Sequence, residues 1–198
     1  MKSSSTSLNG KDLMNVGIFT AINVIGGIVL AIAIGLTPIG FVLIPFASGL
    51  LMGIPMMLYF TRIKKFGMVL ILQVVNGVML LLTGMGPAAL IAGTIMALVV
   101  EYLMHKTRYQ SGKIAVLSHA LLCTSACANY LHWLNASAEW LAKNAETYGA
   151  EFTYTISGWF GYAWVLPAIA CLGFVGGILG GLIGRRVLRK HFIKSGLM

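Results

Sequence analysis

Six long apolar segments constrain this chain more than any other feature of its sequence. The hydrocarbon core of a bilayer is about 30 Å thick, and a helix needs roughly 20 apolar residues to cross it. Backbone groups in lipid have no water to bond, so each crossing segment must be helical. The sequence therefore predicts an all-α membrane protein with six transmembrane helices, at residues 13–36, 39–60, 66–83, 87–104, 114–134 and 160–183.

The basic residues fall in every second gap between these segments. Lys143 is the only one of the 14 Lys and Arg residues that lies in the other set of gaps. Because basic residues collect on the cytoplasmic side of a membrane, both termini are expected in the cytoplasm. The one long connection, residues 135–159, is then expected outside, with a short interfacial helix over residues 137–145.

Composition agrees with one membrane domain over residues 1–198. A mean hydropathy of +0.88 excludes an ordinary soluble globule. The net charge of +9 is spread over positions next to the predicted spans. We therefore attribute this charge to topology and to contact with anionic lipid, and expect no binding of nucleic acid.

The sequence contains no motif that would indicate an enzyme. There is no His-Glu-x-x-His, Gly-x-Ser-x-Gly or Walker A pattern, so neither catalysis nor an ATPase within the chain is expected. No Asp, Glu, Lys or Arg lies near the middle of a predicted span, which argues against an ion-coupled transporter. Glu101, near the inner end of its span, is expected to pair with basic residues of the inner loops.

His119, Cys123 and Cys127 lie four residues apart on one face of the fifth predicted span. Such a row has two interpretations. It is either a soft metal site or a set of small, weakly polar residues at a contact between helices. The second is the commoner arrangement, and we expect no intrinsic metal ion.

Polar and aromatic residues gather at the outer end of the fifth span, in the long connection and at the start of the sixth span. Trp and Tyr often lie at the membrane interface regardless of function, but this does not explain the Asn, His and Glu residues among them. Aromatic walls with a few polar groups are typical of small-molecule sites. We therefore predict a substrate site at Asn129, Tyr130, His132, Trp133, Asn135, Tyr148, Glu151, Tyr154, Trp159 and Tyr162.

His132 is the only one of the four histidines on the predicted outer side. A neutral imidazole at this place can bond a ligand or coordinate haem iron. The alternative is a surface histidine without a ligand.

Small residues form rows on two of the predicted spans. The sixth span carries six glycines between Gly173 and Gly184, and the first carries Gly17 and Ala21 one turn apart. Such rows let helices approach closely, either inside the protein or against another membrane protein. For the first span both interpretations stay open. Pro167 is expected to kink the sixth span.

Several segments resemble the Trep_Strep family of membrane proteins, over essentially the whole chain. They are Lys11-Asp12-Leu13 with Gly17-Ile18-Phe19-Thr20-Ala21, Gly53-Ile54-Pro55 with Thr61-Arg62-Ile63-Lys64-Lys65-Phe66-Gly67, Tyr148-Gly149-Ala150-Glu151-Phe152, and the ending from Gly176-Gly177 through Gly180-Gly181 and Gly184-Arg185-Arg186 to Lys190-His191-Phe192. The layout as a whole resembles the substrate-binding subunit, or S component, of an energy-coupling factor (ECF) transporter.

This resemblance implies an ABC-type importer in a bacterial cytoplasmic membrane. An S component binds a micronutrient near the outer ends of spans four to six. Its partners are a transmembrane coupling protein and two ATPase subunits, which supply the energy. The resemblance assigns Gly17 and Ala21 to docking on the coupling protein, although the motif usually has Ala at both positions.

The resemblance also suggests a ligand. Relatives have been linked to haem uptake, so haem or a related tetrapyrrole is one candidate cargo, with His132 on its iron. A vitamin-like heterocycle is the alternative. Two other classes stay open: a structural or assembly protein without transport, and a membrane-embedded enzyme that uses a His and a Cys.

Overall fold

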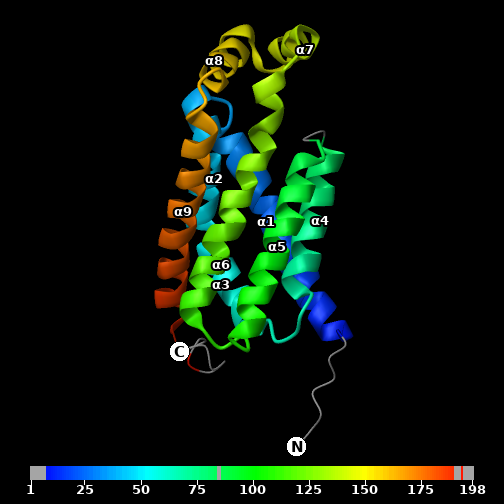
Figure 1. Ribbon diagram of the computed structural model, residues 1–198, viewed down its shortest axis with the longest axis vertical. Helices are drawn as coiled ribbons and strands as arrows, with labels where there is room; N and C mark the ends of the chain where they lie inside the picture. The colour runs from blue at the N-terminus through cyan, green and yellow to red at the C-terminus, as the bar shows by residue number, and fades with distance from the viewer. Residues whose placement is uncertain (1–7, 84–85, 190–192, 194–198) are drawn as a thin grey trace, which may run out of the picture.

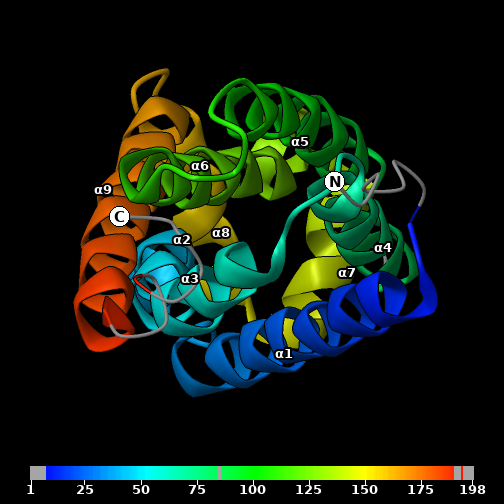
Figure 2. The same cartoon turned by 90° about the horizontal axis from the view of Figure 1, so that it is seen from below.

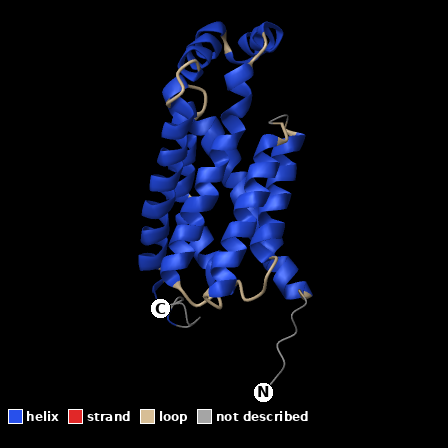
Figure 3. Cartoon of the chain, viewed as in Figure 1, coloured by secondary structure: helices blue, strands red, loops and turns tan. Residues whose placement is uncertain are grey.

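The computed structural model describes residues 8–83, 86–189 and 193, and within these it contains helices, turns and no strand (Figure 3). Lys190, His191 and Phe192 lie outside the described residues. The helices are α1 (Gly10–Ile34), α2 (Pro38–Leu51), α3 (Gly53–Arg62), α4 (Met68–Leu82), α5 (Ala88–Lys106), α6 (Gly112–Ser125), the 3₁₀-helix η1 (Ala126–Asn135), α7 (Ala138–Tyr148), α8 (Ala150–Phe160) and α9 (Val165–Val187).

Among the described residues, four helical stretches are long and apolar enough to cross a membrane. They are α1, α5, α9 and the continuous stretch of α6 and η1. A fifth is added if α2 and α3, which meet at 45°, count as one span. At 15 residues, α4 is shorter than the roughly 20 residues that a full crossing needs. The all-helical membrane class is thus confirmed, and four or five of the six predicted spans are supported by length.

The bend between α2 and α3 has a local cause. Pro55, in the first turn of α3, has no N–H to bond the carbonyl of Leu51, and the missing hydrogen bond allows the chain to bend at this point. Met52 ends α2 by donating its N–H to Ser48 and then starts α3 by accepting from Met56. The predicted span 39–60 is therefore two helices.

The end of the chain differs from the prediction in two ways. The predicted interfacial helix is present as the longer α7, but a further helix, α8, follows it and extends to Phe160. The last long helix therefore starts at Val165, which places Pro167 in its first turn. The first N–H groups of a helix have no partner within it, so proline is tolerated there and the kink expected at Pro167 has no basis.

The long helices form a ring. Contacts join α1 to α4, α4 to α5, α5 to α6, α6 to α9, α9 to α2, and α2 back to α1, as the view from below shows (Figure 2). α1 begins and α9 ends at one end of the molecule, whereas α7 and α8 lie across the other (Figure 1). We call the first the basic end, because the described basic residues of the α3–α4 and α5–α6 loops lie there, and the second the capped end.

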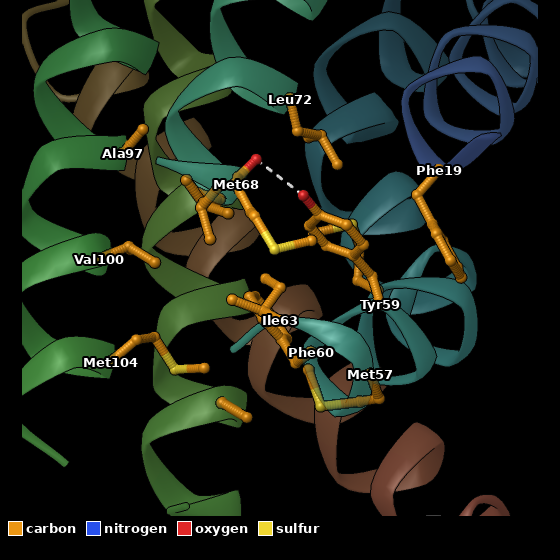
Figure 4. Packing of buried hydrophobic residues seen from close by; sticks show 14 of the residues in the cluster. Phe19, Met57, Tyr59, Phe60, Ile63, Met68, Leu72, Ala97, Val100 and Met104 are labelled. Atoms are coloured by element: carbon orange, nitrogen blue, oxygen red, sulfur yellow. Dashed lines mark hydrogen bonds between the residues drawn. The ribbon is translucent and has the colours of Figure 1, made fainter. Parts of the chain in front are cut away.

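The basic end carries the larger apolar core. Phe19, Tyr59, Phe60 and Met68 are buried there, with Tyr59 5.1 Å from Phe19 between ring centroids (Figure 4). The Tyr59 hydroxyl donates to the carbonyl oxygen of Met68 at 2.7 Å. This core joins α1, α3, α4 and α5 at the basic end of the ring.

The glycines of α9 serve internal packing. A Cβ atom on Gly176 would meet the backbone of Phe46, and one on Gly177 would come within 2.5 Å of the Cα of Ala120. A Cβ atom on Gly184 would lie 2.6 Å from the carbonyl oxygen of Gly53. The row of small residues therefore brings α9 into backbone contact with α2, α3 and α6.

Candidate ligand-binding site

A cavity of about 470 Å³ opens at the capped end of the ring. It lies between the turn that leads into α5, the end of η1 and the start of α7. Its walls are Gly86, Pro87, Ala88, Leu131, His132, Asn135, Ala136, Ser137 and Trp140. Two of the ten predicted site residues, His132 and Asn135, are among them. We call this cavity the outer pocket.

The local structure of η1 determines which of its side chains share a face. A 3₁₀-helix has three residues per turn, so side chains at positions i and i+3 eclipse one another. Asn129, His132 and Asn135 therefore form one polar column, and Tyr130 and Trp133 lie together on an adjacent face. His132 and Asn135 of this column line the outer pocket, whereas the aromatic pair belongs to the packed interior.

His132 is half-buried beside two indoles at the pocket wall. Its ring centroid lies 5.1 Å from that of Trp140, edge to face, and 5.8 Å from that of Trp133. Trp140 in turn lies 4.9 Å from Trp133, also edge to face. These contacts fix the imidazole in place, so it presents a rigid polar edge to anything that enters the pocket.

Tyr130 and Trp133 are core residues rather than pocket walls. Both are buried with Phe152, Ile156 and Phe160 of α8 in one cluster. The Tyr130 hydroxyl donates to the carbonyl of Phe41 on α2 at 2.8 Å. The prediction that both contact the ligand is not supported by their position, because their side chains hold α8 onto the bundle.

The other predicted residues are dispersed over the capped end. Asn129 lies one turn below His132 in the polar column. Trp159 packs against the aromatic cluster. The remaining four are exposed and do not line the outer pocket: Tyr148, Glu151, Tyr154 and Tyr162.

Seven of the nine pocket walls are not among the predicted site residues. Trp140 belongs to the aromatic residues that gather in the outer connection but was not included in the predicted site, and Ser137 was expected only as the start of the interfacial helix. Pro87 comes from the turn before α5, which has no polar or aromatic signal. Only the packing of α5 against η1 brings that turn to the site.

Buried polar atoms without hydrogen-bond partners occur near this site. Among the described residues they include Oδ1 of Asn129, Nε1 of Trp133 and Oγ1 of Thr153. Such atoms are rare in folded proteins, because leaving one unpaired costs about 1–3 kcal/mol. Thr153 lies three residues before Ile156, so it is on the face of α8 that packs on the aromatic cluster.

The row of His119, Cys123 and Cys127 lies inside the ring. Nε2 of His119 donates to the carbonyl of Gly49 at 2.8 Å, which links α6 to α2. Cys123 Sγ lies 3.7 Å from Nδ1 of His119. Within the part of the chain that the structure describes, no three His, Cys, Asp or Glu residues are arranged to hold a metal ion. These contacts favour a helix-packing role for the row.

A second cavity, of about 510 Å³, is an apolar groove between α1 and α4. Gly17 and Ala21 lie on its α1 side, and Ile71, Val75 and Met79 on its α4 side. Both small residues are exposed, and a Cβ atom on Gly17 would have nothing within 4 Å. Unlike the glycines of α9, this pair is not used by internal packing. We call this cavity the α1 groove.

A comparison with protein families identifies the chain. The model of a family described as hypothetical bacterial integral membrane proteins, Trep_Strep, matches residues 10–194. The chain belongs to the Trep_Strep family. It is therefore a bacterial integral membrane protein, in agreement with its candidate spans. No curated protein and no solved structure matches this Trep_Strep chain.

Proposed function

We propose that this Trep_Strep protein is the substrate-binding subunit of an ECF-type importer in the bacterial cytoplasmic membrane. The observation that carries the proposal is the α1 groove. Gly17 and Ala21, the residues that the resemblance assigns to docking, are exposed along an open apolar surface. A transmembrane helix of a coupling protein would approach closely there, because small residues present little side chain.

In the same proposal, the outer pocket is the binding site of the transported ligand. It lies at the capped end, whereas Gly17 lies toward the basic end of α1. A ligand taken up outside and a coupling protein bound near the cytoplasm would then use separate surfaces. Because the sequence has no ATPase motif, two partner ATPases would supply the energy through the coupling protein.

A bulky residue in the α1 groove tests this function. We expect Ala21→Trp to abolish co-purification of the coupling protein and ATPases from host membranes, and to stop uptake. The protein should stay folded, because Ala21 is exposed. Ile32→Trp is the matched control, since Ile32 is an exposed residue of α1 outside the groove.

Two results would contradict the proposal. One is normal association with the ATPases, and normal uptake, in the Ala21→Trp protein. The other is a wild-type protein that associates with no ATPase under conditions in which it remains folded, which would favour a structural or assembly role.

A further inference from the structure

We propose that the outer pocket opens to the outer leaflet of the membrane and takes from it an uncharged amphiphile, a molecule with a hydrocarbon chain and a hydroxyl or amide head. The inference rests on the proposed function in one respect, namely that the pocket holds a cargo. It adds the chemical class of that cargo and the side from which it enters.

The helices around the outer pocket differ in length. At 1.5 Å per residue, the 23 residues of α9 span about 34 Å and the 15 residues of α4 about 22 Å. α9 ends and α4 starts at the basic end, so α4 stops short of the outer end of α9. The column of α6 and η1 likewise continues past the outer ends of α4 and α5 (Figure 1). The outer pocket, which the turn before α5 lines, lies above this shorter side of the ring.

One face of η1 shows where the cover by neighbouring helices ends. Positions three apart share a face of a 3₁₀-helix, so Ala128, Leu131 and Leu134 form a row. Ala128 is buried, whereas Leu131 and Leu134 are exposed. Leu131 lines the outer pocket together with Ala88, at the start of α5. The row is therefore covered as far as the start of α5, and beyond it η1 presents leucines to its surroundings.

The exposed side chains indicate that the pocket mouth faces lipid. Tyr162 and Trp164, just before α9, are exposed, and such residues collect at the headgroup level of a bilayer. Because α4 is about 12 Å shorter than α9, its outer end lies within the hydrocarbon of the outer leaflet. Leu82, at this end of α4, is 77% exposed, which is favourable in hydrocarbon and costly in water. The pocket directly above it is therefore reached from the leaflet.

The walls of the pocket are themselves amphipathic. Pro87, Ala88 and Leu131 give apolar surface, and His132 and Asn135 give polar groups. Within the part of the chain that the structure describes, neither of these two polar side chains has a hydrogen-bond partner. A polar group that faces hydrocarbon without a partner costs free energy. The hydroxyl or amide head of an amphiphile would satisfy both.

The pocket walls carry no charge. None of the nine lining residues is Lys, Arg, Asp or Glu. A phosphate or carboxylate head would lose hydration there without gaining a counter-charge, whereas an uncharged head exchanges water for the polar walls. A volume of about 470 Å³ suits a small molecule. The pocket would thus hold the head and the first part of the chain, with the remainder in the bilayer.

The depth of the pocket mouth is measurable without a ligand. Leu131→Cys, in a protein whose three native cysteines are replaced by alanine, would carry a nitroxide label in lipid nanodiscs. We expect molecular oxygen, which concentrates in hydrocarbon, to relax this label more than a water-soluble nickel chelate does. Leu179→Cys on the exposed face of α9 is the lipid control, and Glu146→Cys on α7 is the water control. A label at position 131 that behaves like the water control would overturn the inference.

Three competitors that share a glycerol head test the ligand class. A photoreactive 1-acylglycerol, with its diazirine close to the head, is crosslinked to the protein in nanodiscs, and labelling of the pocket walls is quantified by mass spectrometry. We expect 1-oleoylglycerol to displace this probe. Its 3-phosphate adds negative charge, and 1-acetylglycerol lacks the long chain. Both should displace the probe at least about tenfold more weakly.

Asn135→Leu removes a polar group of the wall and keeps the approximate size of the side chain. The variant should stay folded, because Asn135 is exposed. We expect it to bind the photoreactive probe about three- to tenfold more weakly, the effect of losing one hydrogen bond. Asn144→Leu is the matched control and should bind the probe like the wild type. Asn144 lies on α7 and is not a pocket wall.

Three results of the binding experiments would overturn the inference. They are equal or stronger displacement by the 3-phosphate, no displacement by 1-oleoylglycerol, and unchanged probe binding in Asn135→Leu. Failure of the proposed function gives a different pattern. If the ATPases do not co-purify but the competitors differ as expected, the importer is rejected and the pocket stands as a site for a resident lipid of the same class. If the ATPases co-purify and the competitors do not differ, only the inference fails.

Discussion

Glu101, on α5, stabilises the start of the neighbouring helix α4. Its side chain is fully buried, and Oε1 accepts from the backbone N–H groups of Gly67, Val69 and Leu70 at 3.0, 2.7 and 3.2 Å. These are N–H groups that the first turn of a helix cannot satisfy by itself. The carboxylate thus takes the part that an N-cap side chain usually takes.

The other oxygen of Glu101 meets the loop between α5 and α6. The Tyr109 hydroxyl donates to Oε2 at 3.4 Å. Burial raises the pKa of Tyr109, and the nearby Glu101 carboxylate raises it further, so the phenol remains a donor at neutral pH. The expectation that Glu101 pairs with basic inner residues is therefore replaced by hydrogen bonds to backbone amides and a phenol.

Removing the Glu101 carboxylate should destabilise the packing at the basic end. We expect Glu101→Ala to lower the free energy of unfolding by about 3 kcal/mol, because several amides lose their acceptor at once. Glu101→Gln retains an acceptor oxygen and should cost less than half as much. Unfolding by titration with a denaturing detergent would measure both. Equal loss in the two variants would mean that the amides do not depend on this oxygen.

At the scale of elements, α9 and α1 use their small residues in opposite ways. A Cβ atom on Gly177 would lie 2.5 Å from the Cα and 3.1 Å from the backbone nitrogen of Ala120, so α6 leaves no room for a side chain there. Gly17 faces the open α1 groove. The few buried residues of α1 are Val16, Phe19, Thr20 and Leu30. The small residues are therefore structural in α9, whereas Gly17 of α1 is available for a partner.

Replacing one glycine by alanine in each helix distinguishes the structural role from the available one. We expect Gly177→Ala to destabilise the protein by about 3 kcal/mol, because α6 and α9 must move apart. Gly17→Ala should be neutral or stabilising by up to about 1 kcal/mol, since alanine favours the helix and has room. Thermal unfolding in one detergent compares the two. A destabilised Gly17→Ala protein would indicate that the groove is closed by internal packing.

The sequence predicts the apolar elements well and their interruptions poorly. Hydropathy locates α1, α5 and α9, because burial in lipid needs only length and composition. It does not reveal the break at Met52, where Pro55 removes a backbone hydrogen bond, or the change to 3₁₀ at Ala126. α8 was missed because its apolar residues face the bundle interior rather than lipid.

The outer pocket includes two of the ten residues that the sequence singled out, His132 and Asn135. Adjacent residues of η1 have different environments: Tyr130 and Trp133 face the core, and His132 faces the pocket. The sequence does not show which of these neighbouring residues face the core, because that depends on how η1 packs against α5 and α8. Pro87 joins the site only through tertiary packing, which no local pattern encodes.

At the scale of the whole molecule, the two ends of the ring have different chemistry. The described basic residues of the α3–α4 and α5–α6 loops and the end of α9 share the end where α1 begins, and Lys143 lies on α7 at the capped end (Figure 1). The Asp12–Lys65 ion pair, at 2.8 Å, ties α1 to the α3–α4 loop at the basic end. The importer account requires the basic end in the cytoplasm and the outer pocket outside.

Cysteine labelling in intact bacteria tests this orientation most directly. Glu146→Cys on α7 and Lys113→Cys at the start of α6 both change exposed positions, in a protein whose three native cysteines are replaced by alanine. A membrane-impermeant maleimide should label the Glu146→Cys protein in intact cells and the Lys113→Cys protein only after permeabilisation. Labelling of position 146 only after permeabilisation would place the pocket in the cytoplasm and contradict the account.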